Sequence, residues 1–173
     1  RGISKKLNTV TKVLNLLRKT KIFGNQSFKI NIQKNIPHGS GLGGGSSNAA
    51  DLLNYFNLKM KLKLNAKVMQ KLADQIGFDV PIYLDRKNTL LTGKKGEMLR
   101  LNQKFRLNVL IVYPNLICST KYIYKKNTTF TLLKRLSYLR KKNNKKLIDD
   151  LKKDKNDLEE TVTKFYPKVK KII

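Results

Sequence analysis

Residues 37–50 of the chain read Pro37-His38-Gly39-Ser40-Gly41-Leu42-Gly43-Gly44-Gly45-Ser46-Ser47-Asn48-Ala49-Ala50. Five of these residues are glycines, and all five precede the run Ser-Ser-Asn-Ala-Ala. Glycine adopts positive φ at little steric cost and lets the backbone approach a ligand where a Cβ would block it. The N–H groups and the dipole at the start of a following helix attract anions. The run therefore predicts a loop that binds phosphate groups at a helix N-terminus.

The helix after this loop is predicted from its first polar residues and from its apolar spacing. Ser46 and Ser47 suit the cap and the first turn of a helix, and their hydroxyls can reach phosphate oxygens or a metal ion. The apolar residues that follow recur at helical spacing, at Ala49, Ala50, Leu52, Leu53 and Phe56. We expect a helix over residues 46–57.

Other kinds of glycine loop fit the surrounding sequence less well. The frame Gly39-x-Gly41-x-x-Gly44 matches the dinucleotide fingerprint, but the acidic residue expected about 20 positions later is replaced by the basic stretch 61–67. A Walker A loop needs a lysine where Gly45 stands. A simple turn that caps a helix needs only one or two glycines. The residues around the loop thus favour a different phosphate-binding motif.

Three segments in order resemble a known enzyme family. Residues 36–50 are similar to the phosphate loop of the GHMP small-molecule kinases, and their Gly-Gly-Gly-Ser-Ser-Asn-Ala-Ala form resembles the 4-diphosphocytidyl-2-C-methyl-D-erythritol kinases within that family. The segment Gly77-Phe78-Asp79-Val80-Pro81 is similar to their Gly-x-Asp-Val-Pro signature, and residues 93–97 are similar to their Gly-x-Gly-Glu hairpin. Agreement at three places is more specific than any one motif.

The resemblance implies an α+β fold of the GHMP kinase type. It implies a phosphate-binding domain like the second domain of ribosomal protein S5 over residues 1–104, and the beginning of a ferredoxin-like domain over residues 105–173. The family's first strand with Lys-Leu-Asn, its Tyr-His pair and its second glycine loop have no counterpart in this sequence. We therefore expect an internal fragment of a longer enzyme, incomplete at both ends and inactive alone.

The resemblance also implies a reaction and its residues. The γ-phosphoryl group of ATP would pass to the 2-hydroxyl of 4-diphosphocytidyl-2-C-methyl-D-erythritol, a step of the non-mevalonate isoprenoid pathway, with Mg²⁺ near Ser46 and Ser47. Asp79 would be the base, paired in the family with a lysine outside this chain. The phosphates would be bound by Pro37, Gly39, Gly41, Leu42, Gly43, Gly44, Gly45, Ser46 and Ser47.

The adenine and substrate pockets follow from weaker matches. Lys34 and Asn8 resemble residues beside the adenine, although a solvated lysine and a helix N-cap asparagine fit the same positions. In residues 114–124, Thr120 and Tyr124 resemble the substrate segment, in which the tyrosine would stack on cytosine. Tyr122 takes that role if the alignment is displaced by two residues.

The charge of the chain favours no other function. The formal net charge of +27 comes from 38 basic and 11 acidic residues. The basic residues are scattered, and the densest run, 141–146, lacks the aromatic residues that stack bases, so we expect a solvated surface there. The alternatives are another GHMP kinase, acting on homoserine, mevalonate or galactose, and a basic RNA-binding module.

Composition sets further limits. Cys118 is the only cysteine, which excludes an internal disulfide. His38 is the only histidine and is expected to be a loop residue. We expect a small-molecule substrate as partner, neither nucleic acid nor membrane, and a bacterial cytoplasmic or plastid-type location.

Periodicity predicts the remaining elements. Helices are expected over residues 4–19 and from Asn65 to Gly77, the latter with Val68, Met69, Leu72 and Ile76 facing inward. Strands are expected at residues 28–32, 80–84, 89–92, 98–101 and 107–113. Two later helical faces are predicted, one with Leu132, Leu133, Leu136 and Leu139 and the other with Leu158, Val162, Phe165 and Val169.

Overall fold

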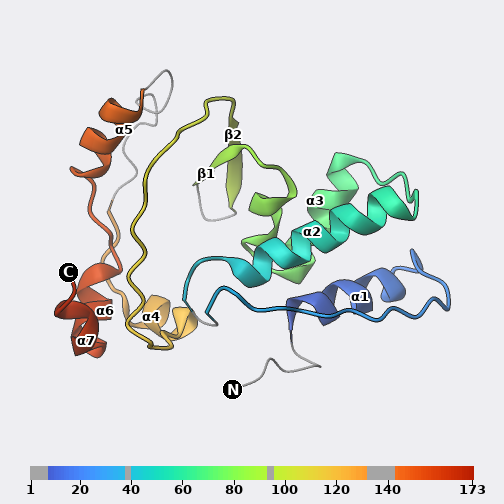
Figure 1. The fold of residues 1–173 in the computed structure, drawn as a ribbon, viewed down its shortest axis with the longest axis horizontal. Coiled ribbons are helices and arrows are strands. Elements are labelled where there is room, and N and C mark those ends of the chain that lie inside the picture. Colours follow the sequence, from blue (N-terminus) through green and yellow to red (C-terminus); the bar gives the residue numbers. More distant parts are fainter. Residues whose placement is uncertain (1–7, 38–39, 93–95, 132–142) are drawn as a thin grey trace. The chain divides into compact units, whose positions relative to one another are not determined.

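Figure 1 shows the computed structural model, which describes residues 8–37, 40–92, 96–131 and 143–173. The chain divides into two compact units: unit 1 comprises residues 1–36 and 42–102, and unit 2 comprises residues 37–41 and 103–173. The family domains expected over residues 1–104 and 105–173 remain predictions. Both helices and a sheet are present, as the α+β prediction requires.

Three α-helices form the body of unit 1 as far as its residues are described. Helix α1 (Thr9–Lys19) begins after Asn8, whose side chain accepts a hydrogen bond from the Thr11 N–H at 2.8 Å. Residues 4–7 of the first helix predicted over residues 4–19 lie outside the described residues, and Asn8, which that prediction placed within the helix, is instead its N-cap. Helix α2 (Gly44–Lys59) starts two residues before and ends two residues after the predicted range. Helix α3 (Ala66–Ile76) is capped by Asn65 as predicted, at 3.0 Å from the Val68 N–H.

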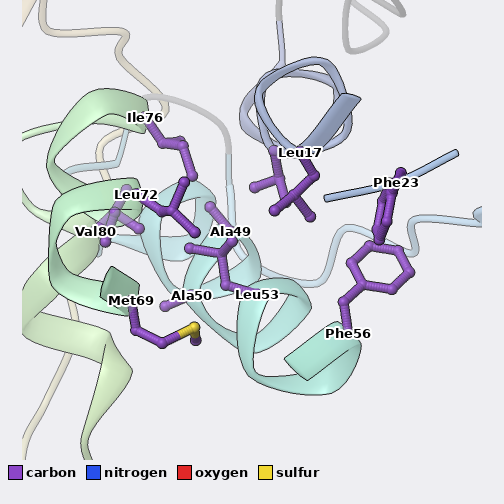
Figure 2. Close-up of a cluster of buried hydrophobic side chains, with 12 residues drawn as sticks. Leu17, Phe23, Ala49, Ala50, Leu53, Phe56, Met69, Leu72, Ile76 and Val80 are labelled. Atoms are coloured by element: carbon purple, nitrogen blue, oxygen red, sulfur yellow. The ribbon is translucent and has the colours of Figure 1, made fainter. Parts of the chain in front are cut away.

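A single apolar cluster joins these helices. Its buried members are Val13, Leu17, Phe23, Ala49, Ala50, Leu53, Phe56, Met69, Leu72, Ala73, Ile76 and Val80. Figure 2 shows this cluster, including the edge-on pair of Phe23 and Phe56, whose ring centroids are 4.8 Å apart. Val68, predicted to face inward, is instead 38% exposed. The core fixes the start of α2 because Ala49 and Ala50 lie one turn after the glycine loop.

The segment predicted as a strand at residues 80–84 is a 3₁₀-helix, η1 (Val80–Leu84). The prediction was wrong because Pro81 lacks an N–H for a sheet ladder and has a φ suited to the first turn of a helix. Turn hydrogen bonds join the Val80 N–H to the Gly77 carbonyl at 3.0 Å and the Ile82 N–H to the Asp79 carbonyl at 3.2 Å. Val80 and Pro81 are buried, so η1 is anchored at its beginning.

Strands β1 (Asn88–Thr92) and β2 (Glu97–Leu101) form an antiparallel pair in which Leu90 faces Leu99. Both strands were predicted, each one residue shorter at its start. Residues 93–96 connect them and belong to the predicted hairpin, and of these 93–95 lie outside the described residues. This pair is the only sheet in the described part of the chain.

Two other predicted strands do not form. Residues 28–32 and 107–113 have no sheet assignment, although their apolar pattern is typical of strands. A helix satisfies its backbone groups within its own segment, whereas a strand needs a neighbouring backbone. Neither segment has such a neighbour among the described residues, and the side chains from Val109 to Val112 are 57–89% exposed.

The described residues of unit 2 form four helices: α4 (Thr120–Lys126), α5 (Asn144–Leu151), α6 (Glu159–Phe165) and α7 (Pro167–Lys170). Buried Ile123 anchors α4, and buried Asn127 accepts a 2.7 Å hydrogen bond from the Thr161 hydroxyl of α6. The predicted face at residues 132–139 lies outside the described residues. The predicted face from Leu158 to Val169 is divided between α6 and α7, which Tyr166 separates, and neither helix buries any of its residues.

Candidate phosphate-binding and catalytic site

The glycine loop has the backbone that its sequence predicts. Gly41 and Gly43 have φ values of 76° and 69°, in the left-handed region that favours glycine. At Gly43 the space is restricted as well, because a Cβ there would lie 1.9 Å from the Tyr83 hydroxyl oxygen. His38 and Gly39 lie outside the described residues. Two separate constraints, backbone conformation and contact with Tyr83, therefore require glycine at position 43.

The loop leads directly into the N-terminus of α2. The Ser47 N–H donates to the Gly43 carbonyl at 2.9 Å and closes the first turn. The N–H groups of Gly44, Gly45 and Ser46 therefore precede the helical ladder, where N–H groups are available to a ligand. Ser46 and Ser47 are half-buried in this first turn. The predicted helix start at Ser46 was two residues late, and Gly43 is the N-cap.

The N-terminus of α1 lies beside the first turn of α2. The Thr9 hydroxyl donates a 2.8 Å hydrogen bond to the Gly45 carbonyl. This contact links residues 36 positions apart, so no local pattern in the sequence indicates it. It brings Asn8 near the glycine loop, although the Asn8 side chain also caps α1.

Asp79 is exposed and immediately precedes η1. Its own φ and ψ of −89° and −10° already suit the turn, and its carbonyl accepts the hydrogen bond from Ile82. Val80, the next residue, is completely buried in the core of unit 1. Asp79 thus presents a carboxylate at the surface, while the buried side chain of Val80 fixes the adjoining backbone to the core. Tyr83, on the same short helix, contacts Gly43 and connects the Asp79 segment to the glycine loop.

Two side chains that sequence analysis missed hold η1. Arg100 of β2 donates to the Pro81 carbonyl at 2.6 Å and to the Ile82 carbonyl at 2.7 Å. Asn54 of α2 donates to the Leu84 carbonyl at 3.2 Å. Arg100 is one of 38 basic residues, and nothing in its neighbours distinguishes it. Only the folded chain brings it to η1.

The other predicted nucleotide residues occupy open positions. Lys34 and Pro37 are exposed in a segment without regular secondary structure, and Leu42 is 43% exposed. The described residues contain no group of three or more His, Cys, Asp or Glu side chains that could hold a metal ion. In the described part of the chain, no helix combines the length and apolar character needed to cross a membrane.

The predicted substrate residues lie on α4 in unit 2. Ser119 caps this helix by accepting from the Tyr122 N–H at 3.3 Å. Thr120 and Tyr124 are four residues apart and therefore share one face of the helix. Tyr122 packs edge-on against Phe165, with ring centroids 5.3 Å apart, and the Lys126 ammonium lies 5.8 Å from its ring centre. Tyr124 is 55% exposed, so of the two tyrosines it offers the more accessible ring.

Comparison with known sequences agrees with this geometry. Residues 8–85 match the model of the GHMP kinases N terminal domain. The chain is 35% identical over 167 residues to 4-diphosphocytidyl-2-C-methyl-D-erythritol kinase of Pelagibacter ubique strain HTCC1062, covering 96% of this chain and 58% of that protein. It is 37% identical over 158 residues to the enzyme of the same name from Buchnera aphidicola subsp. Schizaphis graminum, covering 90% of this chain and 49% of the relative. The chain thus spans about half the length of these relatives.

Comparison with solved structures supports the same fold. The crystal structure of a 4-(cytidine 5'-diphospho)-2C-methyl-D-erythritol kinase matches with a TM-score of 0.70 at 22% identity, over 99% of this chain and 62% of that one. The family match includes the glycine loop, α2, α3 and the Asp79 segment, and the structural match extends over unit 2. Residues 8–85 thus match the GHMP kinases N terminal domain in sequence, and the chain has the fold of the matched GHMP-type kinase.

Proposed function

We propose that the protein transfers the γ-phosphoryl group of ATP to the 2-hydroxyl of 4-diphosphocytidyl-2-C-methyl-D-erythritol. The observation that carries this proposal is the packing of the Asp79 segment, through Tyr83, against a glycine loop at the N-terminus of α2. Phosphoryl transfer depends mainly on positioning and on stabilisation of charge. An anion-binding helix start connected to a carboxylate supplies both. The names of the relatives support the substrate.

The phosphate groups of ATP bind to the backbone of the loop in this proposal. Gly41 and Gly43 turn the chain, and the N–H groups of Gly44, Gly45 and Ser46 donate hydrogen bonds at the positive end of α2. Pro37, Gly39 and Leu42 complete the predicted loop. Lys34 and Asn8 remain the proposed adenine residues, and the hydrogen bond of Thr9 to Gly45 supports the place of Asn8 near the nucleotide.

Mg²⁺ fits this site only as an ion bound together with the triphosphate. Mg²⁺ commonly binds through phosphate oxygens and one or two protein ligands, so the lack of a three-ligand cluster among the described residues is consistent with it. The hydroxyls of Ser46 and Ser47 are the groups in the first turn of α2 that would hold it. When bound, the ion would neutralise charge on the phosphates.

Asp79 acts as the general base in this proposal. Its carboxylate would accept the proton of the substrate hydroxyl as that oxygen attacks the γ-phosphorus and the bond to ADP breaks. The exposed position of Asp79 leaves it accessible to a substrate. The buried neighbour Val80 and the contacts of η1 limit the movement of Asp79. A general base must be held in position in this way.

The substrate residues are proposed on α4. Tyr124 would stack on the cytosine ring, and Thr120, on the same helical face, would donate or accept a hydrogen bond nearby. The ring of Tyr122 already packs against Phe165, which favours Tyr124 for this role. The location predicted from the resemblance, bacterial cytoplasm or a plastid, stays a prediction.

A panel of acceptors tests the proposed reaction. The full-length protein that contains this chain is incubated with ATP and, separately, with the cytidyl substrate, homoserine, mevalonate or galactose, and ADP formation is measured. We expect ADP only with the cytidyl substrate, together with its 2-phosphate in the product. ADP formation with one of the other alcohols would assign the protein to another GHMP activity. Tight binding of RNA with no turnover of any acceptor would instead favour the RNA-binding alternative.

A further inference from the structure

We propose that Arg100 is a positioning residue that holds the Asp79 segment in place for phosphoryl transfer. This inference rests on the proposed function, because it assigns Arg100 a role through the base. Arg100 is half-buried on β2, and all its described hydrogen bonds run to η1 and to β1. It therefore connects the hairpin to the helix that follows Asp79.

The backbone of η1 needs such a partner. A 3₁₀-helix of five residues closes few hydrogen bonds of its own, and the residue three positions after Ile82 lies beyond its end, so no N–H of the helix reaches the Ile82 carbonyl. The Arg100 guanidinium donates from Nη2 to Pro81 and from Nη1 to Ile82, at 2.6 and 2.7 Å. Bonds from a charged donor are stronger than bonds between neutral groups. One planar group therefore binds two successive carbonyls.

The guanidinium is also hydrogen-bonded to strand β1. Nη1 also lies 2.5 Å from the Thr89 hydroxyl oxygen, and Thr89 is the register partner of Arg100 across the two strands. Arginine presents its donors in a rigid fork, whereas lysine is a point charge on a flexible stem. A lysine at position 100 could keep the charge but not this arrangement of three acceptors.

The segment that Arg100 holds carries both parts of the proposed site. Asp79 lies two residues before Pro81, and its carbonyl bonds the Ile82 N–H. Tyr83 follows Ile82 and contacts the loop at Gly43. A shift of η1 would move the carboxylate relative to the glycine loop. Misplacing a catalytic group by about 1 Å can cost up to about 10²-fold in rate.

Steady-state kinetics of Arg100→Ala, Arg100→Lys and Arg86→Ala in the full-length protein test this role. Arg86 is the matched control, since it is exposed and follows η1. We expect kcat to fall about 10- to 100-fold in both Arg100 variants, with the KM for ATP changed less than about twofold. Arg86→Ala should retain wild-type kcat. Wild-type kcat in Arg100→Ala, or rescue by Arg100→Lys, would overturn the inference.

A double mutant separates this role from a general loss of stability. If Arg100 acts through Asp79, then Arg100→Ala should cost much less in the Asp79→Asn background than in the wild type. Equal losses in both backgrounds would overturn the inference. Full activity of Asp79→Asn alone would show instead that the proposed base is wrong, and the role of Arg100 would fall with it. If Arg100→Ala does not fold, Thr89→Val, which removes one acceptor of the guanidinium, serves in its place with the same expected pattern.

Discussion

The glycine loop and helix α4, the two proposed binding regions, are built in different ways. The loop presents backbone groups, and its shape is set by positive φ at Gly43, by Tyr83 and by the core beneath α2. Helix α4 presents the side chains of Thr120 and Tyr124 from a seven-residue helix with one buried residue, Ile123. A change in the backbone of the loop should therefore abolish ATP binding. A change of one side chain on α4 should only weaken the affinity for the substrate.

The largest effect is expected from Gly43→Val. The new side chain would collide with Tyr83 and would require a φ of 69°, which β-branched residues rarely adopt. ATP binding should be lost in a calorimetric titration, with little change in the circular dichroism of the full-length protein. Gly24→Val is the matched control, because a Cβ there meets only Gln26, at 3.8 Å. Unchanged ATP affinity in Gly43→Val would place the phosphates elsewhere.

A smaller and graded effect is expected on α4. Stacking of a base on an aromatic ring is worth about 1–3 kcal/mol, so Tyr124→Ala should raise the KM for the cytidyl substrate roughly 5- to 150-fold with an unchanged Tm. Tyr122→Ala should do the reverse: it should lower the Tm, because its ring packs against Phe165, and should leave KM unaltered. If Tyr122→Ala raised KM and Tyr124→Ala did not, the substrate tyrosine would be Tyr122.

The smallest effect concerns Asp157 in unit 2. Hydrogen bonds from the side chain and the backbone N–H of Thr131 lower the pKa of Asp157 below its usual 3.8, with a further contribution from Lys155. A lowered folded-state pKa stabilises the protein above the unfolded pKa, and this stability is lost as the pH falls through the folded value. Asp157→Asn should therefore flatten the decline in Tm below about pH 5. An identical acid limb in the variant and the wild type would contradict this contribution.

Local features of the chain could be predicted from sequence, whereas contacts between residues distant in the sequence could not. The start of α3 and the glycine loop were predictable because capping, apolar spacing and glycine conformation are local properties. The contacts of Thr9 with Gly45, of Tyr83 with Gly43 and of Arg100 with η1 join residues distant in the sequence, so no local pattern contains them.

The strand predictions show the same limit. The pair of β1 and β2 was predictable because its partner strand follows within a few residues. Residues 28–32 and 107–113 carry strand patterns, but an apolar pattern specifies only a face and supplies no backbone partner. At residues 80–84, Pro81 outweighed an apolar run that is otherwise typical of a strand.

The central claim is that the loop binds ATP while Asp79 performs the chemistry, and Asp79→Asn in the full-length protein tests it most directly. Asp85→Asn is the matched control, since Asp85 is an exposed carboxylate at the opposite end of η1. We predict that Asp79→Asn lowers kcat by about 10²–10⁴-fold while the calorimetric Kd for ATP stays at the wild-type value, and that Asp85→Asn changes neither. Turnover by Asp79→Asn at the wild-type rate would contradict the claim and would reduce Asp79 to a turn residue before η1.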